Sequence, residues 1–267
     1  MRGKAVDFSP CDRNIIMTVR RIYKLILLIP VSFIFLVAGV CVNISLAANE
    51  QLRARANAIC TMLWSRAMCF ILNIRVIRSG LQNPLSGFVV CNHISYIDVL
   101  LLGSVCPSSF LAKSEVKGWP LLGWLATLGG TIFIRRELKK TAIGVIQEIE
   151  RKIDHGVVVI VFPEGTTSDG RSIGRFKSTF FSVPARKNIP VTPLSIRYPS
   201  ELLGTVAWHG GMKLMPHFWN LLDIKSVDAT LHCNQPIASP TEGISAVTAR
   251  KLLCTLAYES VATGARV

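Results

Sequence analysis

The sequence predicts an α/β fold, a mostly parallel sheet flanked by helices, and three observations support it. Strand-like and helix-like segments alternate from residue 75 to residue 198, which is the order found in parallel sheets. Residues 157–162 are apolar without alternation, as in a strand covered on both faces. No charged residue occurs from Leu25 to Asn49, so a separate apolar unit precedes the sheet. We therefore divide the chain into residues 1–74 and residues 75–267.

The first unit is predicted to be an N-terminal membrane-associated helical hairpin. Its apolar run exceeds the about 20 residues that cross a hydrocarbon core, and a long basic leader makes a cleaved signal the weaker interpretation. Basic residues flank both ends of the run, so the positive-inside rule gives no clear orientation. Residues 51–74 mix arginines with large apolar side chains, as an interfacial helix does. We expect a hairpin that dips into one leaflet rather than a single crossing, with bends at Pro30 or Gly39.

The elements of the second unit follow from apolar patterning and from turn residues. A stretch at residues 119–125 is apolar on all sides, and we expect it in the core, with a lid as the alternative. The expected strands are 75–78, 88–91, 131–134, 157–162, 191–198 and 229–233, and the expected helices begin at 98 and span 141–155 and 241–261.

Composition restricts the partners of the chain. Lys and Arg number 30 against 16 Asp and Glu, a net charge of +14, which favours an anionic membrane surface or a phosphorylated substrate. The basic residues are scattered and no nucleic-acid-binding motif is present, so nucleic acid is not expected. The eight cysteines form no C-x-x-C pair and no metal-ligand spacing with the five histidines. We expect no metal site and free thiols, which places the second unit on the cytoplasmic face.

A histidine and an aspartate five residues apart are the first candidates for chemistry. His93 follows the predicted strand at residues 88–91, and Asp98 heads an apolar stretch, which suits the first turn of a helix. At such a corner Asp98 would bond one ring nitrogen, and the other would accept a proton from an alcohol. The pair could also be purely structural, and Cys91 is a less favoured candidate for a nucleophile.

Further polar residues follow other predicted strands, and ligands of parallel sheets gather at the carboxyl ends of the strands. Arg135 and Arg136 end the strand at residues 131–134 and can grip phosphate. Glu164-Gly165-Thr166-Thr167 forms a small-residue loop whose amides and hydroxyls can hold oxyanions. Pro193 belongs to a stiff apolar wall at residues 189–194.

Read together, these stretches resemble the glycerolipid acyltransferase family, which includes lysophosphatidic acid acyltransferases. Asn92 to Asp98 matches the family's N-H-x-x-x-x-D block, and residues 130–136 are similar to its second block. Residues 162–166 match the third block and residues 191–194 the fourth, and Lys113 lies in a further family-like stretch. The blocks occur in order across residues 75–200, which is far more specific than any single motif.

The resemblance implies an enzyme that moves an acyl group from acyl-CoA or acyl-carrier protein to the free hydroxyl of a lysolipid, with no bound cofactor. It makes His93 and Asp98 catalytic, and it gives substrate binding to Lys113, Arg135, Arg136, Glu164, Gly165, Thr166, Thr167 and Pro193. Lysophosphatidic acid is the expected acceptor, and the family also implies a membrane-buried pair of N-terminal helices.

One departure from the family pattern bears on the acceptor. Many members that make phosphatidic acid have arginine where this chain has Thr167, so either Arg171, Arg175 or Lys177 replaces that cation or the acceptor lacks a phosphomonoester. Members that acylate lyso-ornithine lipid look like this chain from Glu164 to Gly170. Two further classes of protein are compatible with parts of the pattern: a thioester hydrolase, and a basic, membrane-anchored lipid-binding protein without activity.

Overall fold

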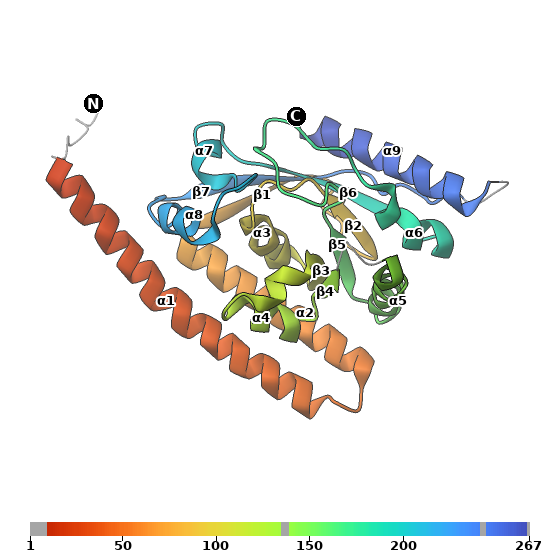
Figure 1. The fold of residues 1–267 in the computed structure, drawn as a ribbon, viewed down its shortest axis with the longest axis horizontal. Helices are drawn as coiled ribbons and strands as arrows, with labels where there is room; N and C mark the ends of the chain where they lie inside the picture. Colours follow the sequence, from red (N-terminus) through yellow and green to blue (C-terminus); the bar gives the residue numbers. More distant parts are fainter. Residues whose placement is uncertain (1–9, 135–138, 241–243, 266–267) are drawn as a thin grey trace.

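The sheet and its topology place the predicted site at one edge of the molecule. The computed structural model describes residues 10–134, 139–240 and 244–265 (Figure 1). Within these ranges one seven-stranded sheet has the order β1-β7-β6-β2-β5-β3-β4. All neighbouring strands are parallel except β6 and β7, which confirms the predicted fold class. The strands are β1 (Ile74–Gly80), β2 (Phe88–Cys91), β3 (Ser108–Lys113), β4 (Ile132–Ile134), β5 (Val158–Val161), β6 (Val191–Arg197) and β7 (Val227–Cys233).

Helices cover both faces of the sheet, so alternate residues of the central strands enter two separate cores. Val89 and Cys91 of β2 pack with the helices that include α2 and α3, whereas Phe88 and Val90 pack with those that include α5 and α9. The helices are α1 (Pro10–Ser45), α2 (Glu50–Leu72), α3 (Ile97–Val105), α4 (Leu122–Leu128), α5 (Lys139–Asp154), α6 (Ser182–Lys187), α7 (Leu203–Val206), α8 (Leu214–Leu221) and α9 (Ala246–Gly264). Burial of β2 and β5 on both faces explains their unbroken apolar sequences.

The N-terminal hairpin is present, and α2 returns along α1 (Figure 1). Asn49 begins α2 by accepting a hydrogen bond from the N–H of Leu52 at 2.9 Å, and Asn73 ends it in the left-handed region at φ 57°. α1 differs from the prediction in its length, because it starts at Pro10 and so includes much of the basic leader. It also continues through Pro30 and Gly39 without interruption.

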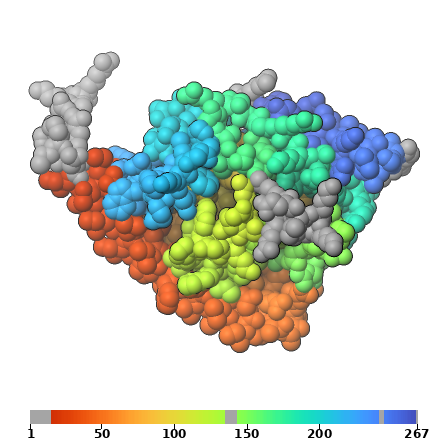
Figure 2. Space-filling view, in the orientation of Figure 1, coloured from red at the N-terminus to blue at the C-terminus, as the bar shows by residue number. Residues whose placement is uncertain are grey.

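Polar contacts hold α1 to the rest of the chain part-way along the helix and near its C-terminal end. The buried ammonium of Lys24 donates to the carbonyls of Leu222 at 3.1 Å and Ile224 at 2.7 Å, and Arg21 pairs with Asp223. Near the C-terminal end of α1, the side-chain N–H of Asn43 donates to the side-chain oxygen of Asn57 in α2 at 3.2 Å. α1 therefore lies along the domain, with its outer side uncovered (Figure 2).

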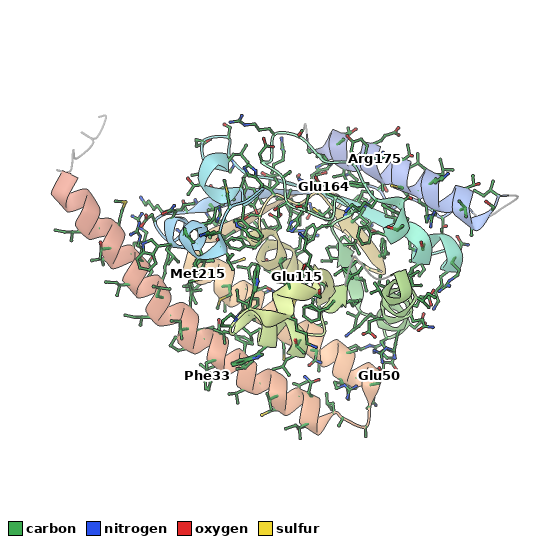
Figure 3. All side chains as sticks on the ribbon, in the orientation of Figure 1. Phe33, Glu50, Glu115, Glu164, Arg175 and Met215 are labelled. Carbon is green, nitrogen blue, oxygen red and sulfur yellow. The ribbon has the colours of Figure 1, made fainter. Side chains whose placement is uncertain are left out.

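The uncovered side of α1 is apolar. Ile15–Ser45 is the one segment of the described chain that is long and apolar enough to cross a membrane. The large apolar side chains that α1 exposes include Ile15, Val19, Ile22, Ile26, Ile29, Phe33, Ile34, Val37, Val40 and Ile44, and Phe33 points outward in Figure 3. An apolar surface of this extent marks an interaction site in a protein.

The expected core position of residues 119–125 is wrong. This stretch forms the turn before α4 and part of α4 itself, where Trp124 is 62% exposed and Leu122 is 39% exposed. A stretch that is apolar on all sides does not show which of its sides is covered. The short helices α6, α7 and α8 were not predicted, because fewer than three turns give too little periodicity to recognise.

Candidate active site

The candidate site is built on the turn between β2 and α3, at the carboxyl edge of the parallel strands. β2 and the start of α3 are buried, which fixes both ends of the turn. Asn92 ties the turn to the neighbouring strand β6: its side-chain amide donates to the carbonyl of Ile196 at 3.0 Å, and its side-chain oxygen accepts from the N–H of Ile196 at 2.7 Å. An amide fits both backbone groups at once, so Asn92 extends the β2–β6 pairing by one residue.

The carboxylate of Asp98 organises this turn. It is fully buried, and its Oδ2 accepts from the N–H groups of Ile94 at 2.7 Å and Ser95 at 2.9 Å. Its Oδ1 accepts from the hydroxyl of Tyr198 at 2.6 Å. Burial and the adjacent carboxylate raise the pKa of Tyr198 well above its ordinary value, so the hydroxyl keeps its proton and donates it. Three donors besides the histidine compensate the desolvation of a buried negative charge.

The imidazole of His93 is held by the same carboxylate. Its Nδ1 lies 2.8 Å from Oδ2 of Asp98, which is the contact that the sequence predicted. Because an ionised carboxylate only accepts, Nδ1 carries the proton and Nε2 keeps its lone pair. The ring stacks on Phe162, with centroids 3.9 Å apart and planes at 13°, and the His93 side chain is 17% exposed. No residue of the described ranges hydrogen-bonds Nε2, so a substrate alcohol can do so.

The loop after β5 holds the backbone of His93. Glu164, 5% exposed, accepts from the N–H of His93 at 2.8 Å and from the N–H of Gly174 at 2.6 Å. The carbonyl of His93 accepts from the N–H of Ser168 at 2.8 Å. Gly165 turns the chain at φ +72°, which favours glycine. Both polar backbone groups of His93 are therefore satisfied by this one loop.

The remaining predicted substrate-binding residues are spread along the sheet. Thr166 is exposed and Thr167 is half-buried, and both lie between Glu164 and Ser168 in the loop beside His93. Lys113 is exposed at the carboxyl end of β3, paired with Ile134 of β4. Pro193 is buried within β6 opposite Val90, inside the sheet rather than at its edge. Arg135 and Arg136 lie outside the described residues, so their roles stay predictions.

The structure adds Tyr198 to the candidate site and argues against Cys91 as a nucleophile. Tyr198 was not predicted, although it directly follows β6 at the sheet edge where ligands gather. Cys91 is fully buried, and burial together with the charges of Asp98 and Glu164 raises the pKa of its thiol well above the ordinary value. A buried thiol that keeps its proton is a poor nucleophile, which argues against Cys91 as the attacking group. Within the described ranges no three His, Cys, Asp or Glu side chains come together to hold a metal ion.

Comparisons with known proteins agree with this arrangement. An acyltransferase family model matches residues 74–197. A lyso-ornithine lipid O-acyltransferase of Rhizobium meliloti is 35% identical over 60% of this chain and 60% of its own. A protein of the same name from Pseudomonas aeruginosa is 31% identical over 69% of this chain and 71% of its own. A 1-acyl-sn-glycerol-3-phosphate acyltransferase of Neisseria gonorrhoeae is 32% identical over 49% of this chain and 51% of its own.

A solved structure has the same fold. The crystal structure of the 1-acyl-sn-glycerophosphate acyltransferase PlsC from Thermotoga maritima matches with a TM-score of 0.60 and 21% identity, over 91% of this chain and 96% of that one. The family match over residues 74–197 defines an acyltransferase domain. Together with the sequence relatives, it shows that this chain belongs to the glycerolipid acyltransferase family, and the resemblance stated from the motifs is confirmed.

Glu164 generates a prediction about stability. Burial raises its pKa above the ordinary value of 4.5, although the N–H groups of His93 and Gly174 oppose the shift. The native state therefore binds this proton more tightly than the unfolded state, and the contribution of the carboxyl to stability declines as the pH rises through the window above 4.5. Unfolding by urea at several pH values should show the free energy of unfolding of the wild type falling, relative to Glu164→Gln, as the pH rises. A difference that is constant with pH would contradict the assignment.

Proposed function

We propose that this protein transfers a fatty acyl group from a thioester, acyl-CoA or acyl-carrier protein, to the free hydroxyl of a lysolipid. One observation carries the proposal: His93 is held by Asp98, and Nε2 of the partly exposed imidazole is left as an acceptor. A lipid-binding protein without activity would not need a buried carboxylate to orient an imidazole.

The reaction proceeds by direct attack, without an acyl-enzyme. Nε2 of His93 takes the proton of the acceptor hydroxyl while that oxygen attacks the thioester carbonyl carbon. A carbon–oxygen bond forms, the carbon–sulfur bond breaks, and the imidazolium returns the proton to the leaving thiolate. Asp98 stabilises the imidazolium meanwhile. The Phe162 ring fixes the plane of the imidazole, and the loop of Glu164 fixes its backbone.

Cations that end β3 or follow β4 in the sequence are proposed to hold the anionic parts of the substrates. Arg135 and Arg136 suit the phosphate of the acceptor or of the donor's pantetheine arm. Exposed Lys113 ends β3, at the carboxyl edge of the parallel strands. A raised Michaelis constant for the acceptor in Arg136→Ala would support this assignment, and an unchanged one would count against it.

The acceptor that we propose is lyso-ornithine lipid. Relatives named lyso-ornithine lipid O-acyltransferase are 35%, 31% and 31% identical to this chain, and Thr167 stands where arginine would be expected for a phosphomonoester. Lysophosphatidic acid, which the motifs alone favoured, is the second candidate. It is supported by the Neisseria relative at 32% identity.

We also propose that the protein sits on the cytoplasmic face of a membrane, with the hairpin in one leaflet. The exposed apolar side of α1 supplies the contact. Contacts at Lys24 and Asn43 hold α1 along the domain, so we place α1 in the leaflet beside the domain rather than across the bilayer. The seven cysteines from Cys41 to Cys254 are free, as in a reducing compartment.

Two substitutions test the base. His93→Ala removes it, and Asp98→Asn keeps the size and an acceptor oxygen but removes the charge that stabilises the imidazolium. We expect each to lower turnover by about 10²–10⁴, measured as labelled diacyl lipid formed from acyl thioester and lysolipid. His209→Ala is the matched control and should keep wild-type turnover. Near-normal turnover of a folded His93→Ala would refute the mechanism.

A third substitution tests the acceptor. The wild type should acylate lyso-ornithine lipid faster than lysophosphatidic acid. Thr167→Arg should shift the ratio of the two rates toward lysophosphatidic acid by about ten-fold, because a guanidinium binds a phosphomonoester strongly. Thr179→Arg adds the same charge at an exposed position elsewhere and should leave the ratio unchanged. If the wild type prefers lysophosphatidic acid, the proposed acceptor is wrong and the second candidate holds.

Labelling tests the membrane arrangement. Cysteines introduced as Lys4→Cys and Gln82→Cys should both react with a membrane-impermeant maleimide in inverted vesicles, and neither should react in right-side-out vesicles. The parent chain provides the background from native thiols such as exposed Cys41. Labelling of the two positions from opposite sides would establish a single crossing.

A further inference from the structure

A charged hollow lies at the edge of the sheet opposite to His93. It has a volume of about 170 Å³ and lies between the hairpin, the end of α4 and the end of α5. Gly130 of its wall comes shortly before β4, and His155 comes shortly before β5. His93 instead follows β2, which runs parallel to β5. Figure 3 shows Glu50, another residue of the wall, at the lower right beside the hairpin turn, and Glu164 near the top of the view.

Cations dominate the wall of this hollow. Arg53, Arg151 and Lys152 line it against a single lining carboxylate, that of Glu50. Arg151 already pairs with Glu50 and with Glu148. Among the described residues, the guanidinium of Arg53 has one hydrogen bond, to the carbonyl of Ala47 at 3.2 Å, and no ion pair. The positive charge of the wall is therefore incompletely balanced.

Lys152 is the least balanced of the three cations. It is only 9% exposed, and its Nζ has one carboxylate nearby among the described residues, Glu148 at 4.0 Å. Burial lowers its pKa, and the charges of Arg151 and Arg53 lower it further against the opposing effect of Glu148. An ammonium buried with other cations is costly unless an anion joins it.

The backbone of Gly130 lies close to the ammonium of Lys152. Gly130 adopts φ +77°, and a Cβ at this position would lie 2.5 Å from Nζ of Lys152. A side chain there would require the ammonium to shift. Buried Asn57 adds an amide to the wall, and amides and guanidinium groups donate to oxyanions.

We infer that this hollow is an anion site that binds a phosphate group, separate from the acyl-transfer site. A phosphate offers more oxygens and more negative charge to the donors of Arg53, Arg151 and Lys152 than the one carboxylate of the wall does. The hollow adjoins the turn at the end of α1, the helix whose apolar side we assign to the membrane. The phosphate comes either from the headgroup of an anionic lipid or from solution.

Two binding measurements on the full-length chain distinguish these sources. The first is partitioning onto phosphatidylcholine vesicles with and without phosphatidylglycerol, and the second is calorimetric titration of the detergent-solubilised chain with inorganic phosphate. The variants are Arg53→Ala and Lys152→Met, and Lys251→Ala on exposed α9 is the control that removes one charge elsewhere. Circular dichroism confirms folding, and turnover on detergent-dispersed substrate should match the wild type in all three.

For a lipid headgroup, Arg53→Ala should weaken binding to the phosphatidylglycerol vesicles by about ten-fold, with no effect on phosphatidylcholine alone and no saturable binding of inorganic phosphate. For free phosphate, the wild type should give saturable binding that Arg53→Ala and Lys152→Met weaken by about ten-fold. If both variants match Lys251→Ala in both measurements, the inference is wrong. Arg53 is only half-buried, so Arg53→Ala is expected to fold. Its binding measurements therefore test the inference even if Lys152→Met fails to fold.

Discussion

The buried carboxylate of Asp98 is the interaction on which the rest of the site depends. It receives hydrogen bonds from a ring nitrogen, two backbone N–H groups and a phenol hydroxyl. A charge with no solvent contact is stable only when its donors are fixed in place. The donors come from the turn after β2 and from Tyr198 after β6. The same hydrogen bonds that compensate the buried charge therefore also position the imidazole. The contacts that the turn needs in order to fold are the contacts that give the site its catalytic geometry.

The arrangement of strands extends this constraint across the sheet. β2 lies between β5 and β6, so the loops that follow all three strands converge on His93. One supplies Glu164 and Ser168, which satisfy the backbone of His93, and the other supplies Tyr198. Residues separated by about one hundred positions in the chain thus act together. The central position of β2 in the sheet is what makes the site rigid.

The sequence was sufficient for the α/β class, the hairpin and the contact between His93 and Asp98, because these follow from local patterns: apolar runs, alternation and a five-residue spacing. It was not sufficient for Tyr198 or for the core position expected of residues 119–125. Whether Trp124 is covered, or which hydroxyl reaches Asp98, depends on neighbours that are distant in the chain. The family pattern added the acyl-transfer hypothesis, which the residues alone did not specify.

The polar contacts between α1 and residues 222–224, which precede β7, have a consequence for biosynthesis. Lys24 finds its carbonyl partners 198 and 200 positions later in the chain. At about 5–20 residues per second, a ribosome needs roughly 10–40 s to make the intervening polypeptide. During that time the longest apolar helix of the described chain has emerged, and among its folded partners α2 alone follows it closely, so much of its apolar side stays uncovered. A lipid surface or a chaperone must therefore shelter it, so delivery to the bilayer during translation would precede completion of the domain.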